Sequence, residues 1–303
     1  MRRTSDIRCL AVILVLSVSA TVAAVPPTGH YIGLSVAGGV SGMQLSEAPA
    51  VSPAIGGAAE GMLLYDLNYR GFLFQAGLGA SWQQYGLGID TYSDSRPAVD
   101  ITGEGHDYVY TYSSLRESGS RLSGQLSVMA GWQSGSPFYF LAGMRLRYAL
   151  SASYTTRTDL QTAGQYERWA ADYITNRPDY GFYERSAYQT SGRSASRPLC
   201  IAPTVELGAS FGAGRKTVVR AAVYGVYGIH AGSRQELPLT DYSGVDLNPF
   251  TQSEDNLHRT LRINSLTDTR LTGGYNSWEA GIRLTVLWNV YHRQEHCRCE
   301  LDQ

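Results

Sequence analysis

The chain has 303 residues and a formal net charge of −1, and 17% of its residues are charged, whereas globular domains average about a quarter. This balance excludes an electrostatic case for nucleic-acid binding. Glycine and tyrosine are abundant, at 33 and 21 residues, as is typical of curved sheets with aromatic rims. Beyond residue 24 no apolar run reaches about 18 residues, so no membrane-spanning helix is expected there.

The N-terminus has the three regions of a secretory signal peptide in order. Arg2, Arg3 and Arg8 supply positive charge, Leu10–Val18 is mostly apolar, and small residues up to Ala24 fit a cleavage site. We therefore expect residues 1–24 to be removed on export. A folded domain over 25–290 and a polar C-terminal tail over 291–303 are expected to follow.

A period of two dominates the remaining sequence and predicts strands. Every second residue from Phe72 to Trp82 is apolar, and the intervening residues are mainly small or polar. This alternation is typical of a strand with one apolar face. It predicts eight strands of about ten residues, the length that crosses a bilayer at barrel tilt: 31–40, 60–69, 72–82, 121–132, 138–150, 201–211, 218–229 and 278–289.

The joints between these segments alternate strictly between short and long. The short joints 68–71, 133–137 and 212–217 are rich in turn residues. A soluble β-sandwich has no reason for such alternation, whereas an outer-membrane barrel has short periplasmic turns and long outer loops. The sequence therefore predicts an all-β fold, a transmembrane antiparallel up-and-down β-barrel of eight strands. Its four long extracellular loops would be 41–59, 84–120, 151–200 and 230–277.

In this layout, residues 29–290 resemble the small eight-stranded outer-membrane barrels, the class of the OmpA transmembrane domain and OmpX. They are also similar to the broad outer-membrane β-barrel domain family. The resemblance rests on architecture and implies a bacterial outer-membrane location, contact with outer-membrane lipids and recognition by the barrel-insertion machinery. Such barrels often end on an aromatic residue, whereas here Trp288 and Tyr291 precede a polar tail.

Charged residues on the polar strand faces are expected to point into the barrel. Eight strands leave a lumen just filled by side chains, and arginine facing lipid costs about 2–4 kcal/mol at the midplane. We expect an ion-pair network that plugs the lumen, with Glu206 facing arginines of the neighbouring strands. A narrow pore for small solutes, lined by the same residues, is the alternative. The network residues are Asp66, Arg121, Arg145, Arg147, Glu206, Arg220, Glu279 and Arg283.

The long segment 151–200 mixes tyrosine, tryptophan and arginine, the residue types of binding hot spots. We therefore expect a non-enzymatic protein that is structural or binds an unidentified extracellular ligand through its outer loops. The alternative for this segment is a pair of strand extensions above the membrane, with aromatic side chains stacked across the hairpin. The candidate binding residues are Tyr166, Trp169, Tyr173, Tyr180, Tyr183, Arg177 and Arg185.

A membrane-embedded hydrolase or acyltransferase is a further alternative, because histidine and aspartate occur in or beside the long loops. Gly208–Gly212 has the spacing of a nucleophile elbow but lacks the strand–turn–helix context that this motif needs. We expect no catalytic residue, no cofactor and no metal site, since the C-terminal His and Cys residues lack the surroundings of a metal centre. The polar loop candidates are His106, Asp107, His230, Asp241 and His258.

Overall fold

The computed structural model describes residues 28–46, 50–99, 103–133, 136–167, 173–175, 177, 182–194, 198–212, 216–231, 236–241, 261–272 and 274–292. The expected signal peptide and the tail beyond residue 292 lie outside these residues. So do His258, Trp169 and Tyr180, and for Tyr173 only the backbone is described.

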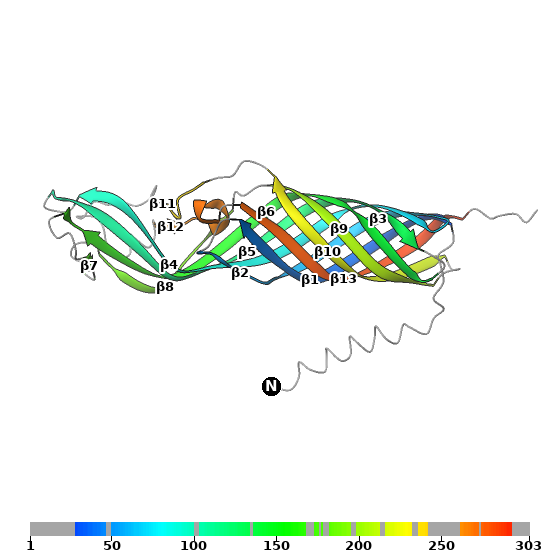
Figure 1. Cartoon of the computed structure of the whole chain (residues 1–303), viewed down its shortest axis with the longest axis horizontal. Helices are drawn as coiled ribbons and strands as arrows, with labels where there is room; N and C mark the ends of the chain where they lie inside the picture. Colours follow the sequence, from blue (N-terminus) through cyan, green and yellow to red (C-terminus); the bar gives the residue numbers. More distant parts are fainter. Residues whose placement is uncertain are drawn as a thin grey trace, which may run out of the picture.

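Eight antiparallel strands pair into a closed ring (Figure 1). Each strand pairs with the next ring strand along the chain, and the last pairs with the first. All eight predicted segments lie within these strands, and the prediction of an all-β antiparallel fold is confirmed. The ring strands are β1 (Gly29–Ser46), β3 (Gly56–Tyr69), β4 (Phe72–Val99), β5 (Gly105–Gln133), β6 (Phe138–Gln165), β9 (Leu199–Phe211), β10 (Thr217–Ala231) and β13 (Gly274–His292).

The joint between β3 and β4 is a two-residue turn that requires positive φ at both positions. Arg70 has φ 51° and Gly71 has φ 88°, as in the primed turns that match the twist of a hairpin. A Cβ atom on Gly71 would lie 2.5 Å from the carbonyl oxygen of Gln133. Glycine is therefore needed here both for its backbone conformation and for the close approach of β5.

Three ring strands continue far beyond the ring. β4 and β5 stay paired as far as Val99 and Gly105, and the outer part of β6 pairs with β8 (Glu184–Arg193) and β7 (Tyr173–Thr175). We call Gln84–Val99, Gly105–Ser120, Ser153–Gln165, β7 and β8 the extension; Figure 1 shows it projecting from one end of the ring. The predicted loops 84–120 and 151–200 are thus wrong over most of their length, because the backbone ladder does not end with the apolar segments.

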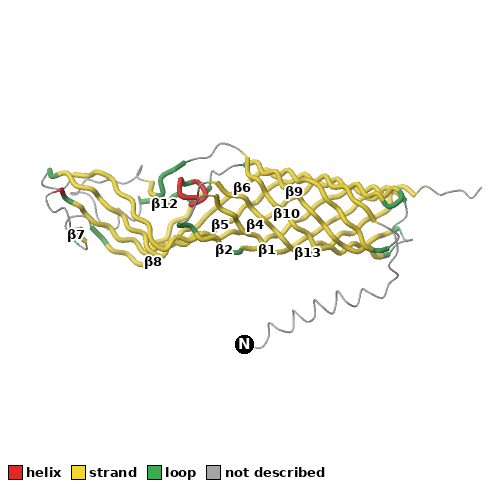
Figure 2. The backbone as a smooth tube through the Cα atoms, in the orientation of Figure 1, coloured by secondary structure: helices red, strands yellow, loops and turns green. Residues whose placement is uncertain are grey.

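The extension bends where its strands change register. Register shifts occur between Ser113 and Arg116 in β5 and between Thr158 and Leu160 in β6. Ser114 and Ala187 beside them have φ 51° and 53°. Such bulges bend a strand and increase its twist, and Figure 2 shows the extension turning away from the axis of the ring.

Part of the predicted loop 230–277 folds back over the ring. We call Leu237–Asp241 and Leu261–Thr272 the cap. It contains β11 (Thr240–Asp241), β12 (Arg262–Ile263) and two short 3-10 helices, η4 (Leu266–Asp268) and η5 (Arg270–Thr272). Its apolar side chains belong to the same buried cluster as Tyr85, Leu87 and Leu115 of the extension. In the predicted loop 41–59, β1 extends to Ser46, β2 (Ser52–Ala54) pairs with β4, and β3 begins at Gly56.

Candidate functional site

All eight predicted lumen residues are buried inside the ring. At the end with the short turns, Arg220 binds Asp66 through two parallel hydrogen bonds of 2.6 and 3.2 Å. The Arg220 guanidinium also lies 5.0 Å from the centre of the Tyr139 ring. Such bidentate pairing is the strongest geometry that arginine and carboxylate form.

The next level of the lumen is organised around Glu60. Its carboxylate accepts from Arg145 at 2.5 Å and from Arg283, and Arg147 lies 3.7 Å away. Arg283 also donates to Glu206 at 2.6 Å, and Glu206 accepts from the Tyr139 hydroxyl. Glu60 lies six residues before Asp66 on the same strand, and residues an even number of positions apart share one face of a strand. This even spacing could have predicted from the sequence that Glu60 faces the lumen.

Glu206 therefore does not pair as predicted. Its ion-pair partner is Arg283 on β13 rather than the arginines of the adjacent strands, while Arg145 pairs with Glu60 and Arg220 with Asp66. The ring is narrow enough for side chains to reach across it. A charged residue can therefore form its ion pair with a residue of a distant strand instead of one on a neighbouring strand.

Two further levels complete the filling of the lumen. Arg147 binds Glu279, which also accepts from Gln83. Nearer the extension, Arg121 donates to the Tyr275 hydroxyl and contacts His230 Nδ1.

The tautomer of His230 follows from these contacts. Because arginine only donates, Nδ1 is the acceptor, so Nε2 of His230 carries the hydrogen and donates to the Ser277 hydroxyl at 3.0 Å. His230, a candidate for loop chemistry, is therefore a buried structural residue of the lumen.

The cap closes the end of the ring next to the extension. Glu117 of β5 accepts from the Leu266 backbone amide at 2.7 Å and from the Ser265 hydroxyl at 2.8 Å. Burial raises the pKa of the Glu117 carboxyl to about 7, although these two hydrogen bonds lower it. Tyr112, Tyr154 and Tyr188 make hydrogen bonds to Thr240, Ile263 and Leu261 of the cap.

Two of the predicted loop-binding residues lie in the core of the extension. Tyr166 is 2% exposed and Tyr183 8% exposed, and both belong to the buried cluster that runs along the extension and also includes the apolar side chains of the cap. The prediction that they present a binding surface is therefore wrong, because the alternation that buries one face of the paired strands also buries these rings. Arg177 and Arg185 are exposed.

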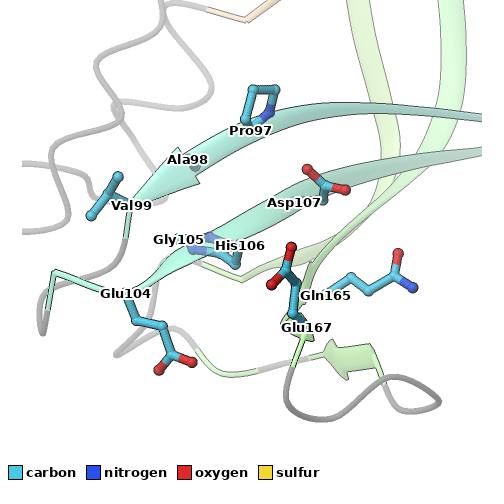
Figure 3. Close-up of a pocket in the computed structure, with 9 residues that line it drawn as sticks. All are labelled: Pro97, Ala98, Val99, Glu104, Gly105, His106, Asp107, Gln165 and Glu167. Atoms are coloured by element: carbon cyan, nitrogen blue, oxygen red, sulfur yellow. The ribbon is translucent and has the colours of Figure 1, made fainter.

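The tip of the extension holds an open hollow of about 900 Å³ between the ends of β4, β5 and β6. Figure 3 shows Glu104, Asp107 and Glu167 around it, with carboxylates that point in different directions. Within the described ranges, no group of three or more His, Cys, Asp or Glu side chains could hold a metal ion.

The remaining catalytic candidates do not assemble a site. The His106 ring is buried and stacks on Tyr166, with ring centres 4.8 Å apart, and meets the edge of Phe182. Ser210, the serine of the Gly208–Gly212 motif, is buried in the lumen, where it donates to Gln133 and accepts from Arg220. Asp241 lies in β11 of the cap.

The outside of the ring is apolar. Leu63, Leu78 and Ile282 are 61%, 63% and 62% exposed, whereas the charged residues that β3 and β13 carry within the ring are buried: Glu60, Asp66, Glu279 and Arg283. We call this outer surface the apolar belt. Every ring strand contributes to it: Ile32, Leu63, Leu78, Leu126, Met144, Leu207, Val223 and Ile282.

In the part of the chain that the structure describes, no helix is long and apolar enough to cross a membrane. Comparison of the sequence with known proteins finds no family model that matches the chain, and no curated protein matches it significantly.

Proposed function

We propose that the chain is an integral protein of the bacterial outer membrane, a non-enzymatic eight-stranded β-barrel with a closed lumen. Its extension would stand on the cell surface, where it is structural or binds an extracellular ligand. Outer-membrane lipids would surround the barrel, and the barrel-insertion machinery would fold it into the membrane.

The observation that carries this proposal is the inversion of polarity in the ring. Leu34, Val36 and Leu284 are about half exposed, and the arginines and carboxylates lie inside. In water, such a belt would forgo about 25 cal/mol for each Å² of apolar surface left uncovered. In lipid, the same surface is solvated and the inward charges escape the penalty for facing hydrocarbon.

The height of the belt supports the same reading. Phe72 pairs with Trp132, and ten positions along the same strands Trp82 pairs with Leu122. On the other side of the ring, Trp278 and Trp288 are again ten positions apart. Ten residues at about 3.4 Å per residue and a tilt near 45° span about 24 Å, close to the apolar band of outer-membrane barrels.

The packing of the lumen opposes the narrow-pore alternative. Four levels of hydrogen-bonded side chains fill the ring, and the cap lies over its end. We expect the mature protein, refolded into a planar bilayer, to show no discrete conductance steps. A heat-modifiable shift in gel mobility provides the folding control; discrete steps from a folded sample would contradict a closed lumen.

The orientation can be tested with single cysteines on intact cells. In a background with Cys297→Ser and Cys299→Ser, Ser95→Cys places a thiol on the exposed face of the extension, and Lys216→Cys places one beside a short turn. A membrane-impermeant maleimide should label the cysteine at 95 on intact cells and the cysteine at 216 only after lysis. The reverse pattern, or labelling of both on intact cells, would contradict the proposed orientation.

A further inference from the structure

A second hollow lies on the outside of the extension, just beyond the apolar belt. It has a volume of about 410 Å³ and is lined by small polar side chains of β4, β5, β6 and β8, among them Ser118, Ser120, Ser153 and Ser191. The register places these residues in rows across the sheet: Gln84, Ser120, Ser153 and Arg193 form one, and Gly86, Ser118, Thr155 and Ser191 the next. No large side chain interrupts either row between its ends.

Arginines border this hollow. Arg193 ends the lower row, and the row above the hollow places Arg116 directly opposite Arg157. Both are exposed, and like charges directly opposite each other on a sheet destabilise the pairing. The two side chains turn away from each other, Arg116 toward Ile89 and Asp90 of β4 and Arg157 toward Gln189 of β8. An anion between the strands would give both a common partner, since guanidinium groups bind phosphate bidentately.

The polar partners of these arginines leave the area positively charged. Arg116 donates through Nη1 to the carbonyl oxygens of Ile89 and Leu115 at 3.2 and 3.1 Å. Its Nη2 pairs at 3.0 Å with Asp90, whose side chain is 94% exposed, and exposed pairs of this kind are weak. Arg157 donates through Nε to Gln189 at 2.8 Å. Three arginines stand beside this floor of hydroxyl groups, with Asp90 and Asp159 beyond them on the side away from the apolar belt. The net positive charge suits the phosphate of a phosphorylated sugar or glycerol group.

The apolar belt begins immediately below this hollow. Trp82 pairs with Leu122, two positions before the row of Gln84 and Ser120, and both side chains are exposed on the outside. An amphiphile with acyl chains along the belt would therefore hold its head group against the hydroxyl groups, with its phosphate within reach of the arginines.

We propose that this hollow, bordered by Arg116, Arg157 and Arg193, binds the phosphorylated head group of an anionic lipid of the outer leaflet. The inference rests on the proposed membrane location and adds a specific lipid site to it. Charge complementarity and continuity with the apolar belt favour a lipid over a free anion.

The test uses the folded mature protein in detergent, titrated with diphosphorylated lipid A and with the same lipid after removal of its phosphates. Native mass spectrometry would count the bound lipid. We expect the phosphorylated form to bind about tenfold more tightly or better, since each arginine near a membrane surface attracts anionic lipid appreciably. Equal binding of the two forms would overturn the proposal.

Charge variants test the assignment of the site. The triple variant Arg116→Gln, Arg157→Gln and Arg193→Gln should lose this preference, whereas a matched variant with Arg70→Gln, Arg96→Gln and Arg185→Gln should keep it. Ser153→Trp, which fills the hollow without changing its charge, should also weaken binding. Equal losses in the two triple variants would indicate non-specific attraction and refute the site.

Two controls separate the remaining outcomes. If millimolar inorganic phosphate displaced lipid A completely, the hollow would be a small-anion site and the lipid assignment would be wrong. Heat-modifiable mobility and flotation with phosphatidylcholine vesicles are measured on the same samples. A wild-type protein that fails both contradicts the proposed function, whereas one that passes both but shows no lipid preference contradicts this inference alone.

Discussion

Replacement of Glu60 by alanine should destabilise the ring more than any change at an exposed ion pair. The Glu60 carboxylate contacts Arg145, Arg147 and Arg283, and all four side chains are at most 3% exposed. Removal of one partner of a buried pair costs about 3–5 kcal/mol, because the other charge stays buried without compensation.

The structure also sets an upper limit on this loss. After Glu60→Ala, Arg283 would keep Glu206 and Arg147 would keep Glu279. Arg145 would lose its carboxylate, and its Nε and Nη2 atoms have no hydrogen-bond partner within the described residues. The cost should therefore correspond to one uncompensated charge rather than three, about 3–5 kcal/mol in the free energy of unfolding.

Urea unfolding of protein refolded into phosphatidylcholine vesicles, followed by tryptophan fluorescence, measures this free energy by linear extrapolation. Arg116→Gln, which breaks the exposed pair with Asp90, is the matched control and should cost less than about 1 kcal/mol. The double variant Glu60→Gln with Arg145→Met should recover much of the loss, because a buried pair replaced by neutral groups is often tolerated. If Glu60→Ala cost no more than Arg116→Gln, the reasoning about the lumen would be refuted.

Three other predictions test the belt, the cap and a turn. Leu284→Arg should cost about 2–4 kcal/mol in vesicles if this residue faces lipid, and a change near zero in the same urea assay would argue for a water-exposed surface. Burial raises the pKa of Glu117 to about 7, so this carboxyl holds its proton more tightly when the cap is in place than when the cap is open. The protonated carboxyl therefore stabilises the closed cap fully below pH ~4.5, and this stabilisation declines as pH rises through 7. Amide exchange of 261–272, corrected for intrinsic rates, should therefore show more protection at pH 5 than at pH 8, and Glu117→Gln should remove the difference; equal protection in the wild type would contradict this. Gly71→Ala should cost about 1–2 kcal/mol, because its φ is 88° and a Cβ would meet the Gln133 carbonyl. Unchanged urea unfolding would contradict the need for glycine in this turn.

The ring strands could be predicted from the sequence because each has one apolar and one polar face. The alternation from Phe72 to Trp82 is local, and it requires no knowledge of the partner strand. The length of the strands could not be predicted in the same way. Each predicted strand was limited to about ten residues, the length that crosses a bilayer. The actual β5 is longer, and Tyr108, Tyr110 and Tyr112 continue its alternation and are buried.

The lumen shows a similar division between local and long-range information. The alternation of strand faces predicted which charged residues point inward. The same alternation, applied to Glu60, would have predicted the carboxylate at the centre of the lumen. It could not predict that Glu206 pairs with Arg283, since that contact joins residues 77 positions apart across the ring. The cap is beyond such reasoning, because Leu261 and Leu266 are buried through contacts with distant strands and follow no strand-like period.

The long pairing of β4 and β5 has a mechanical consequence. β4 has 28 residues, which at about 3.3 Å per residue is close to 90 Å of strand, and its ladder with β5 runs from Phe72 and Trp132 to Val99 and Gly105. A pull on the tip along this direction would put both strands under tension and would load the ladders that join them to β3 and β6 in shear, with many hydrogen bonds resisting at once. A sideways force on the tip would exert a torque on the ring, because the extension is long. Bending would be expected first at the bulges near Ser114 and Ala187. The extension would thus be rigid, and its tip would stay at a fixed distance and direction from the ring.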